Sequence, residues 1–345
     1  MTKDELLWTV IAVEGIGLTI AFGAILGHAL WAAAADRSLR RRMRVGRRLM
    51  LASLEGGIDD ELVGRLRRLG RRTEIRLLAE LAPSLEGAQR VTLRDLATRL
   101  GLTARAKGRC RSRLWWRRLY AARLLTLIDG GEDVMPSLIR DPHQLVRTQV
   151  AEWASQHATP SMLTALVGLL DDEKRIARFA VQDTLLRIGR PAVPVLVDAV
   201  AKMSPRGIAS GLLVAARLGD AELLPLGLAL ADHAAAMVRE QAADVLGAIG
   251  GDAAVAVLAS MLDDPATDVR QAAARGLGRL EHWESATALL PLMGDSTWLV
   301  RRESALALAA MGAPGSLILR TAQQGEDRFA ADIAAQALGV LAEPS

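Results

Sequence analysis

The chain has 345 residues, of which 51% are hydrophobic and only 3% aromatic, and its formal net charge is +4. A core of this composition must be built from Ala, Leu and Val, which suit closely packed helices. The single cysteine, Cys110, excludes an internal disulfide and a cysteine metal cluster.

The N-terminal region contains a long apolar run, residues 6–35, which is interrupted only by Glu14 and His28. At about 1.5 Å per residue, a helix of this length can cross a bilayer with some tilt. Trp8 and Trp31 bracket the run at positions where interfacial aromatic anchors sit. We therefore predict an uncleaved N-terminal transmembrane anchor that ends near residue 36.

An arginine-rich segment, residues 37–48, follows the apolar run and is predicted to lie beside the membrane. Its members, which are expected to contact anionic lipid, are Arg37, Arg40, Arg41, Arg42, Arg44, Arg47 and Arg48. The positive-inside rule then places the N-terminus outside and the remaining chain in the cytoplasm, as a single-pass protein of the inner membrane. A cleaved signal peptide and a buried hairpin of a soluble protein are the alternatives.

One face of the predicted anchor carries its polar and small residues. At helical spacing this stripe consists of Glu14, Gly17, Ala21, Ala24 and His28. An ionisable group at membrane depth faces protein by default, and small residues let a second helix approach closely. The stripe predicts a membrane-protein partner, with tolerated polarity as the alternative.

A basic region extends from the arginine-rich segment to residue 123. Residues 37–123 hold 24 Lys and Arg against 8 Asp and Glu, a net charge of +16. Segments 62–83 and 90–106 have apolar residues at helical spacing, with arginines between them. We interpret residues 49–114 as a basic, divergent helical cap of the array that follows.

Two adjacent tryptophans, Trp115 and Trp116, stand among the arginines 111, 113, 117 and 118. Such a cluster could stack bases beside phosphate contacts in a nucleic-acid-binding protein. Adjacency to a membrane favours lipid contact for the basic region. Because adjacent residues of a helix cannot face the same way, we expect the tryptophans to pack into the cap.

A repeat organises the chain from residue 115 to residue 345. The pair Val-Arg recurs at a spacing of 31 residues and opens the phrases at 238–250, 269–281 and 300–312. Looser copies begin at Val146, Ala177, Gly207 and Ala330, and no strand-like alternation occurs. This period predicts an all-α solenoid of stacked helix pairs, about eight to ten in number.

The repeated unit, a leucine-rich helix followed by Asp-Asp-Pro, Val-Arg, Ala-Ala and Leu-Gly, resembles the HEAT repeat in its short bacterial form, which is related to phycobilisome-lyase-type HEAT-like repeats. HEAT repeats place an Asp six residues before an Arg, and the resemblance implies a structural ladder of these charges. The pairs are Asp141/Arg147, Asp172/Arg178, Asp264/Arg270 and Asp295/Arg301. The unit around Gly207 lacks the pair.

The resemblance to membrane-anchored HEAT proteins implies a cytoplasmic scaffold for protein–protein interaction, such as an accessory subunit of a polysaccharide glycosyltransferase or a transport assembly. We expect protein partners, including a membrane protein, and membrane lipids, but no nucleic acid or small-molecule substrate. The sequence holds no recognisable catalytic, cofactor-binding or metal-binding motif, so an enzyme is not expected. A lyase-like HEAT enzyme and a nucleic-acid-binding HEAT protein stay open as alternatives.

Overall fold

The structure, a computed structural model, describes residues 3–342, apart from the side chains of residues 3–16, 18, 34, 55 and 340–342. The described chain contains helices and turns but no strand. It divides into two compact units between Gly131 and Glu132. The predicted array starts earlier, at residue 115, so its first helix lies in the first unit.

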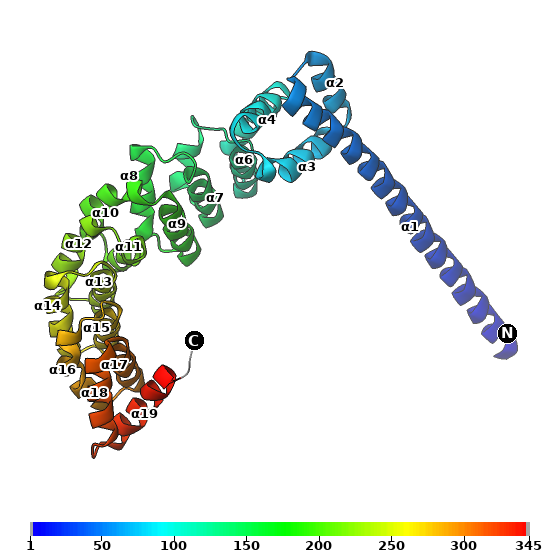
Figure 1. Ribbon diagram of the computed structural model, residues 1–345. Helices are drawn as coiled ribbons and strands as arrows, with labels where there is room; N and C mark the ends of the chain where they lie inside the picture. The colour runs from blue at the N-terminus through cyan, green and yellow to red at the C-terminus, as the bar shows by residue number, and fades with distance from the viewer. Residues whose placement is uncertain (1–2, 343–345) are drawn as a thin grey trace. The chain divides into compact units, whose positions relative to one another are not determined.

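The α-helices of the first unit, within the described residues, are α1 (Lys3–Gly56), α2 (Asp60–Arg68), α3 (Arg71–Leu81), α4 (Gly87–Arg99), α5 (Leu102–Cys110) and α6 (Trp115–Leu127). Helices α2–α6 are called the cap here (Figure 1). The predicted helical segments 62–83 and 90–106 are each interrupted once, by Gly70 and Gly101. Both glycines have positive φ, which costs them little because they lack a Cβ.

Helix α1 runs without a break through the apolar run, the arginine-rich segment and the first residues of the predicted cap. Its 54 residues make it about 80 Å long. Near its C-terminal end Gly46, Met50 and Ser53 are buried, and a Cβ at Gly46 would overlap Leu77 of α3. One continuous helix therefore leads from the apolar run into the core of the first unit.

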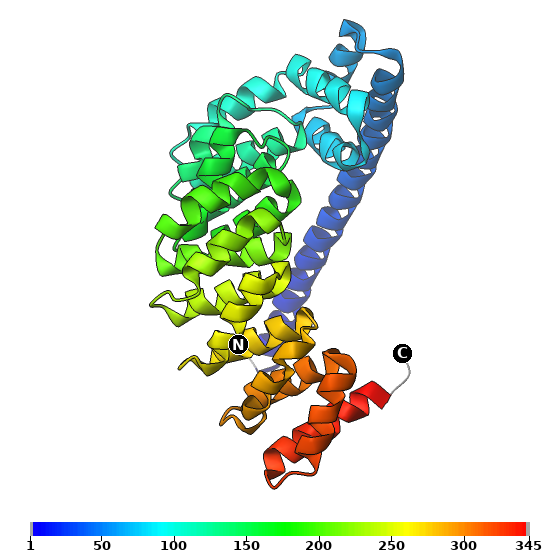
Figure 2. The ribbon, with the colours of Figure 1, turned by 60° about the vertical axis from the view of Figure 1, so that its left-hand side comes forward.

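The second unit is a stack of helix pairs, each with an outer and an inner helix (Figures 1 and 2). The outer row contains η2 (Met135–Arg140), α8 (Pro160–Gly168), α10 (Val193–Ala199), α12 (Leu224–Leu230), α14 (Asp252–Ser260), α16 (Ala286–Leu289) and α18 (Gly312–Gln323). The inner row contains α7 (Gln144–Ala154), α9 (Arg175–Ile188), α11 (Pro205–Leu218), α13 (Ala236–Ile249), α15 (Thr267–Arg279), α17 (Trp298–Ala310) and α19 (Arg328–Ala342).

The 31-residue phrases are the inner helices. The phrases at 238–250, 269–281 and 300–312 coincide with α13, α15 and α17. Several outer helices end in a short 3₁₀ turn, for example η3 (Leu169–Asp171) after α8 and η7 (Met261–Asp263) after α14. The predicted all-α solenoid of stacked helix pairs is confirmed.

Small residues set the spacing of the inner row. A Cβ at Gly247 of α13 would overlap the backbone of Gly276 in α15, and a Cβ at Gly278 would overlap Ala307 in α17. Ala242 and Ala273, which belong to the same helices, are fully buried. Neighbouring inner helices therefore touch backbone to backbone, which accounts for a core made of Ala and Gly rather than aromatic side chains.

Candidate functional site

The apolar part of α1 is exposed wherever its side chains are described. The side chains of Trp8 and Glu14 lie outside the described part of the structure. Gly17, Ala21, Ala24 and His28 are exposed, and Trp31 is 69% exposed, with its ring 6.1 Å from that of His28. Within the described residues, the segment Thr19–Leu54 is the one that is long and apolar enough to cross a membrane, and none of its most apolar stretch is buried.

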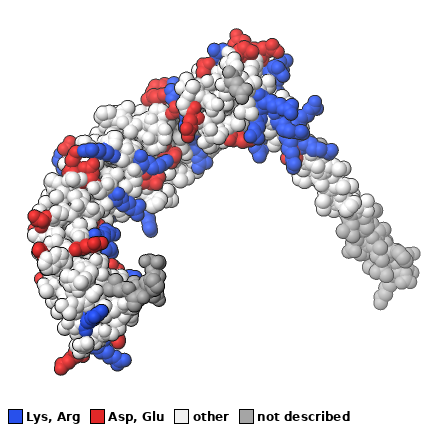
Figure 3. All heavy atoms as spheres, in the orientation of Figure 1, with Lys and Arg blue, Asp and Glu red and all other residues white. Residues whose placement is uncertain are grey.

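The arginines of α1 lie mainly on one side of the helix. All seven between residues 37 and 48 are exposed. At about 100° per residue, six of them fall within roughly a third of the helix circumference. These six, called the arginine ridge here, are Arg37, Arg40, Arg41, Arg44, Arg47 and Arg48. The buried residues Gly46, Met50 and Ser53 lie on the opposite side, and Figure 3 shows the basic side chains gathered where α1 meets the cap.

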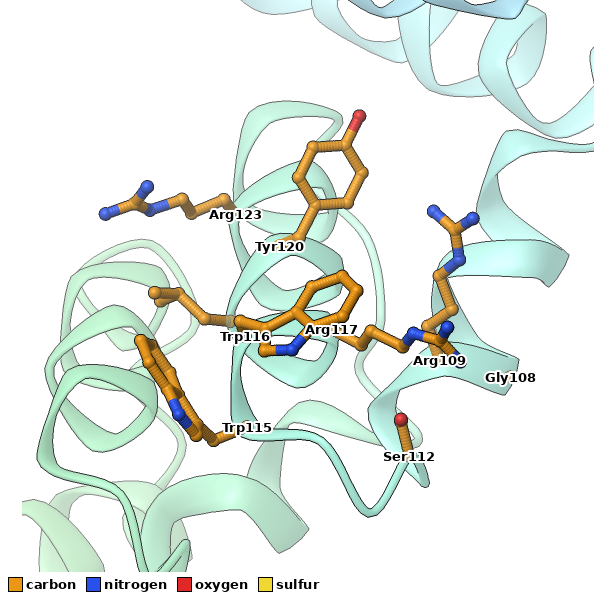
Figure 4. A pocket seen from close by; sticks show the side chains of 9 residues that line it. Gly108, Arg109, Ser112, Trp115, Trp116, Arg117, Tyr120 and Arg123 are labelled. Carbon is orange, nitrogen blue, oxygen red and sulfur yellow. The ribbon is translucent and has the colours of Figure 1, made fainter.

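The cap carries an open cavity of about 720 Å³ between α5 and α6, called the aromatic groove here. Its lining residues are Gly108, Arg109, Ser112, Trp115, Trp116, Arg117, Leu119, Tyr120 and Arg123. Figure 4 shows the rings standing out from α6, with Arg109 beside them from α5. Trp115, Trp116 and Tyr120 are 40%, 51% and 42% exposed. The expectation that the tryptophans pack into the cap is therefore wrong: both begin α6, and from its first turn both reach the same groove.

Arginine side chains order the aromatic groove. The guanidinium carbon of Arg117 lies 5.0 Å from the ring centre of Trp116, and that of Arg109 lies 5.8 Å from the ring centre of Tyr120. Arg118, by contrast, holds the turn before α6, because its Nη1 donates to the carbonyls of Ser112 at 2.8 Å and Arg113 at 3.1 Å. Two arginines thus contact the rings, and a third fixes the loop that positions them.

The repeated Asp and Arg residues form contacts between successive repeats. Arg147 donates to the backbone carbonyl of Asp141 in its own repeat at 2.6 Å, and its Nε and Nη2 reach the carboxylate of Asp172 in the next repeat at 2.6 and 2.9 Å. Arg270 joins Asp264 to Asp295 in the same way. Arg178 and Arg301 donate to the carbonyls of Asp172 and Asp295.

Arg239 makes a bridge that the sequence pattern missed. Its own repeat has His233 in place of the usual Asp, yet Arg239 donates to the His233 carbonyl and to both carboxylate oxygens of Asp264, at 2.7 and 2.8 Å. The ladder therefore needs only a carbonyl from the arginine's own repeat and a carboxylate from the next one. A spacing of 25 residues between Arg and Asp, not 6, is the signal that would have found it.

The ladder also shifts the titration of its acids. The hydrogen bond from Arg239 lowers the pKa of the Asp264 carboxyl. For Asp295, burial opposes ionisation, but the hydrogen bonds from Arg270 and the Thr297 amide prevail and lower its pKa. The side chains of Asp264 and Asp295 are only 9% and 10% exposed. The hydrogen bonds that their carboxylates accept favour the ionised form despite this burial.

The ladder is interrupted at α11, where the side chains are small. Here Ser204, the residue before α11, donates from its amide and hydroxyl to Asp171 of the preceding repeat. A Cβ at Gly207 would overlap Asp171, and one at Gly211 would overlap Val200. The unit that lacks the Asp/Arg pair is therefore joined to its neighbour by close packing and a Ser–Asp contact.

A second cavity, of about 420 Å³, lies over α11 and is called the inner groove here. Its floor contains Ala209, Ser210 and Leu213 of α11, while Phe179 of α9 and Met237 of α13 stand on either side. Phe179 is 68% and Met237 48% exposed. The groove forms because α11 carries small residues between two helices that carry large ones. Sequence analysis did not single out these residues.

Charged side chains surround the inner groove. Its basic lining residues are Arg175, Arg178, Arg206 and Arg217, and its acidic ones are Asp183 and Glu240. Burial raises the pKa of Glu240, and the nearby carboxylates of Asp268 and Asp244 raise it further. Among the described residues, no cluster of His, Cys, Asp or Glu has an arrangement suited to a metal ion. The inner groove therefore offers apolar contacts within a rim of mixed charge.

Family comparison identifies the repeats. Residues 193–272 and 258–339, which span α10 to α19, match the family model described as HEAT repeats. Comparison with curated protein sequences gives no match. Among solved structures, the Kap95:Nup1 complex is 12% identical over 85% of this chain and 49% of that chain, with a TM-score of 0.52. This similarity concerns the fold alone.

Two other similar structures have lower TM-scores. Human deoxyhypusine hydroxylase in complex with glycerol is 19% identical over 69% of this chain and 95% of that chain, with a TM-score of 0.30. The CpcE–CpcF complex of phycocyanin lyase from Nostoc sp. is 18% identical over 61% of this chain and 94% of that chain, with a TM-score of 0.35.

The expectation that this chain is not an enzyme is contradicted, because the similar structures include a hydroxylase and a lyase. A fold by itself does not decide between catalysis and binding. The described chain is an all-α, HEAT-like solenoid that contains HEAT repeats within residues 193–339.

Proposed function

We propose that this protein is a membrane-tethered scaffold whose HEAT-like array binds a protein partner in the inner groove. The partner would be a component of a membrane-bound enzyme or transport assembly, to which this chain is an accessory subunit. The proposal has two parts, a binding surface on the array and a tether formed by α1, and each has its own test.

The inner groove is the observation that carries the binding role. Phe179 and Met237 expose large apolar side chains on both sides of the small-residue helix α11. Contiguous exposed apolar surface with a polar rim is typical of protein-interaction sites. HEAT repeats generally mediate protein interactions, and the similar Kap95 structure is a complex with Nup1. A partner with an apolar side chain at the centre of its interface fits this groove.

The features of α1 support the tether. Its apolar segment is exposed, and its length and composition suffice to cross a membrane. The arginine ridge and Arg42 follow the apolar run of residues 6–35, which favours a cytoplasmic location for the cap and the array. Each arginine near an anionic surface adds about 1 kcal/mol to the attraction. The stripe of Gly17, Ala21, Ala24 and His28, with Glu14, supports a lateral helix partner in the membrane.

Site-specific crosslinking tests the inner groove. A photoreactive phenylalanine analogue placed at Phe179 should give a discrete adduct with a membrane-associated protein in cells. The same analogue at Leu317 of α18, an outer-row residue that is 68% exposed, is the matched control. Identical adducts at both positions, or none at position 179, would contradict the binding role of the groove.

Reporter fusions test the tether separately. A reporter fused after Ser345 should behave as cytoplasmic and one fused before Met1 as external, and the protein should stay in the membrane fraction after an alkaline wash. Release of the intact chain by that wash would refute the tether and leave the inner groove to be judged by crosslinking.

A further inference from the structure

We propose that the aromatic groove of the cap is a second binding site, and that its ligand is an acidic peptide segment with an apolar anchor residue. The inference rests on the lining of this groove and on the charge around it. It does not depend on the tether or on the inner groove, which belongs to the other unit.

The groove concentrates a residue class that this chain otherwise lacks. It holds the single tyrosine and two of the seven tryptophans of a protein in which aromatic residues make up 3%. Each of the three rings is at least 40% exposed. Leaving such side chains in water forgoes the burial that would stabilise the fold. Trp, Tyr and Arg are also the residues most enriched at the energetic centres of protein interfaces.

The charge around the groove selects an acidic ligand. Between Asp95 and Asp129 the sequence has nine Lys and Arg and no Asp or Glu. Arg109, Arg117 and Arg123 line the groove itself, and no acidic residue does. A carboxylate placed at this rim meets several guanidinium groups without a competing acid from the groove, so electrostatic complementarity favours peptides rich in Asp or Glu.

The positions of the arginines favour a peptide over a nucleic-acid strand. Arg117 and Arg109 already lie over the rings of Trp116 and Tyr120, where a base would have to stack. The rings and the buried Leu119 leave an apolar interior, which suits a Leu, Pro or Phe side chain. A bound peptide could place this anchor between the rings and its carboxylates on the arginines at the rim.

The groove is also held in shape before any ligand arrives. The hydrogen bonds from Arg118 to the carbonyls of Ser112 and Arg113 fix the turn that begins α6. Because the backbone at this point is ordered by the protein's own contacts, binding need not include the entropic cost of ordering it. We therefore expect a peptide to bind to the groove as it stands.

A binding assay on the full chain in nanodiscs of neutral lipid tests the proposal. The probe is a labelled pool of short peptides in which Glu alternates with randomised Leu, Pro or Phe, and the readout is fluorescence anisotropy. A pool with Lys in place of Glu should not bind, and affinity for the Glu pool should fall as salt concentration rises. Tighter binding of an oligothymidylate or of phosphatidylglycerol vesicles than of the Glu pool would overturn the proposal.

Substitutions in the groove locate the binding site. Trp116→Ala and Arg123→Glu should each weaken binding of the Glu pool about tenfold, as expected when a contact at the centre of an interface is lost. Trp283→Ala changes an exposed tryptophan of the other unit, 58% exposed, and should leave binding unchanged. Since Arg123 is exposed, Arg123→Glu should keep the helical circular dichroism spectrum. Unchanged affinity in both groove variants would refute the site.

Discussion

At the scale of single residues, Glu281 occupies a position where the repeat uses glycine. It follows α15 with a φ of 51°, while Gly250 and Gly312, one repeat earlier and one later, have φ values of 81° and 69°. A side chain in this left-handed region costs about 1 kcal/mol or more because its Cβ crowds the backbone. The turn forms despite Glu281, since the stacking of α15 and α17 imposes it.

Substitution of Glu281 by glycine is therefore expected to stabilise the array by about 1 kcal/mol. The Glu281 side chain is exposed, so its removal uncovers no part of the core. Urea unfolding of the full chain, followed by helical circular dichroism, gives the measurement. Gly312→Ala is the mirror-image control: its Cβ would meet no atom within 4 Å, so any destabilisation comes from the backbone alone. Equal midpoints for wild type and Glu281→Gly would show that the turn carries no strain.

At the scale of helices, the ladder joins α7, α13 and α15 each to the next repeat through Arg147, Arg239 and Arg270. Arg270 and Asp295 are 16% and 10% exposed in their side chains and share two hydrogen bonds. Arg302 and Glu303, on α17, form a pair in which the arginine is 47% exposed. Removing one partner of the Arg270–Asp295 pair leaves the other charge poorly hydrated. When the Arg302–Glu303 pair is broken, water hydrates the exposed arginine in place of the lost contact.

Arg270→Lys should consequently destabilise the array by about 2 kcal/mol, because an ammonium group cannot span two carboxylate oxygens and a carbonyl at once. Arg302→Lys should change stability by less than about 1 kcal/mol. Both variants keep the net charge, so the comparison isolates geometry. Equal losses in urea unfolding would indicate that charge alone matters at position 270.

The ladder also predicts a dependence of stability on pH. The pKa of Asp264 is lowered in the folded chain, so its contribution is complete above the pKa of about 4 that an unfolded Asp has, and is lost as the pH falls through the lower folded value. The stability difference between wild type and Asp264→Asn should therefore be large at neutral pH and shrink in acid. Comparing the two proteins at each pH removes the titration of other groups, including Glu240. A difference that does not vary with pH would contradict the shift.

The helices could be predicted from the sequence because their signals are local. The 31-residue phrase located the inner helices, and Gly70 and Gly101 end helices where φ becomes positive. Contacts between repeats were harder to predict. Arg239 meets Asp264 although its own repeat lacks the Asp, because the bridge joins residues 25 apart in sequence that come together only when successive repeats are stacked.

At the scale of the whole molecule, both grooves arise from packing that no short motif records. The inner groove exists because α11 has small residues where α9 and α13 have Phe179 and Met237, a comparison that requires the helices to be aligned in space. The aromatic groove exists because the first turn of α6 brings Trp115 and Trp116 to one cavity. Adjacent residues usually diverge on a helix, and this general rule gave the wrong expectation.

Because α1 is one continuous helix, the rotation of the anchor about the helix axis determines the direction in which the cap faces. Each residue inserted into a helix turns everything beyond it by about 100° and moves it by about 1.5 Å. One alanine inserted after Asp36 should therefore swing the aromatic groove about the axis of α1, whereas seven should return it to within about 20° of its original direction. If one membrane partner binds both the stripe of Gly17, Ala21 and Ala24 and the cap, its co-purification should fail with one inserted alanine and recover with seven.

Equal co-purification by the two insertions would show that a flexible attachment suffices. If co-purification fails with one alanine and recovers with seven, α1 is a rigid helix that fixes the rotational orientation of the cap relative to the membrane anchor. The helix then determines the direction, in the plane of the membrane, in which the cap offers its groove, as well as the height at which the cap stands above the lipid.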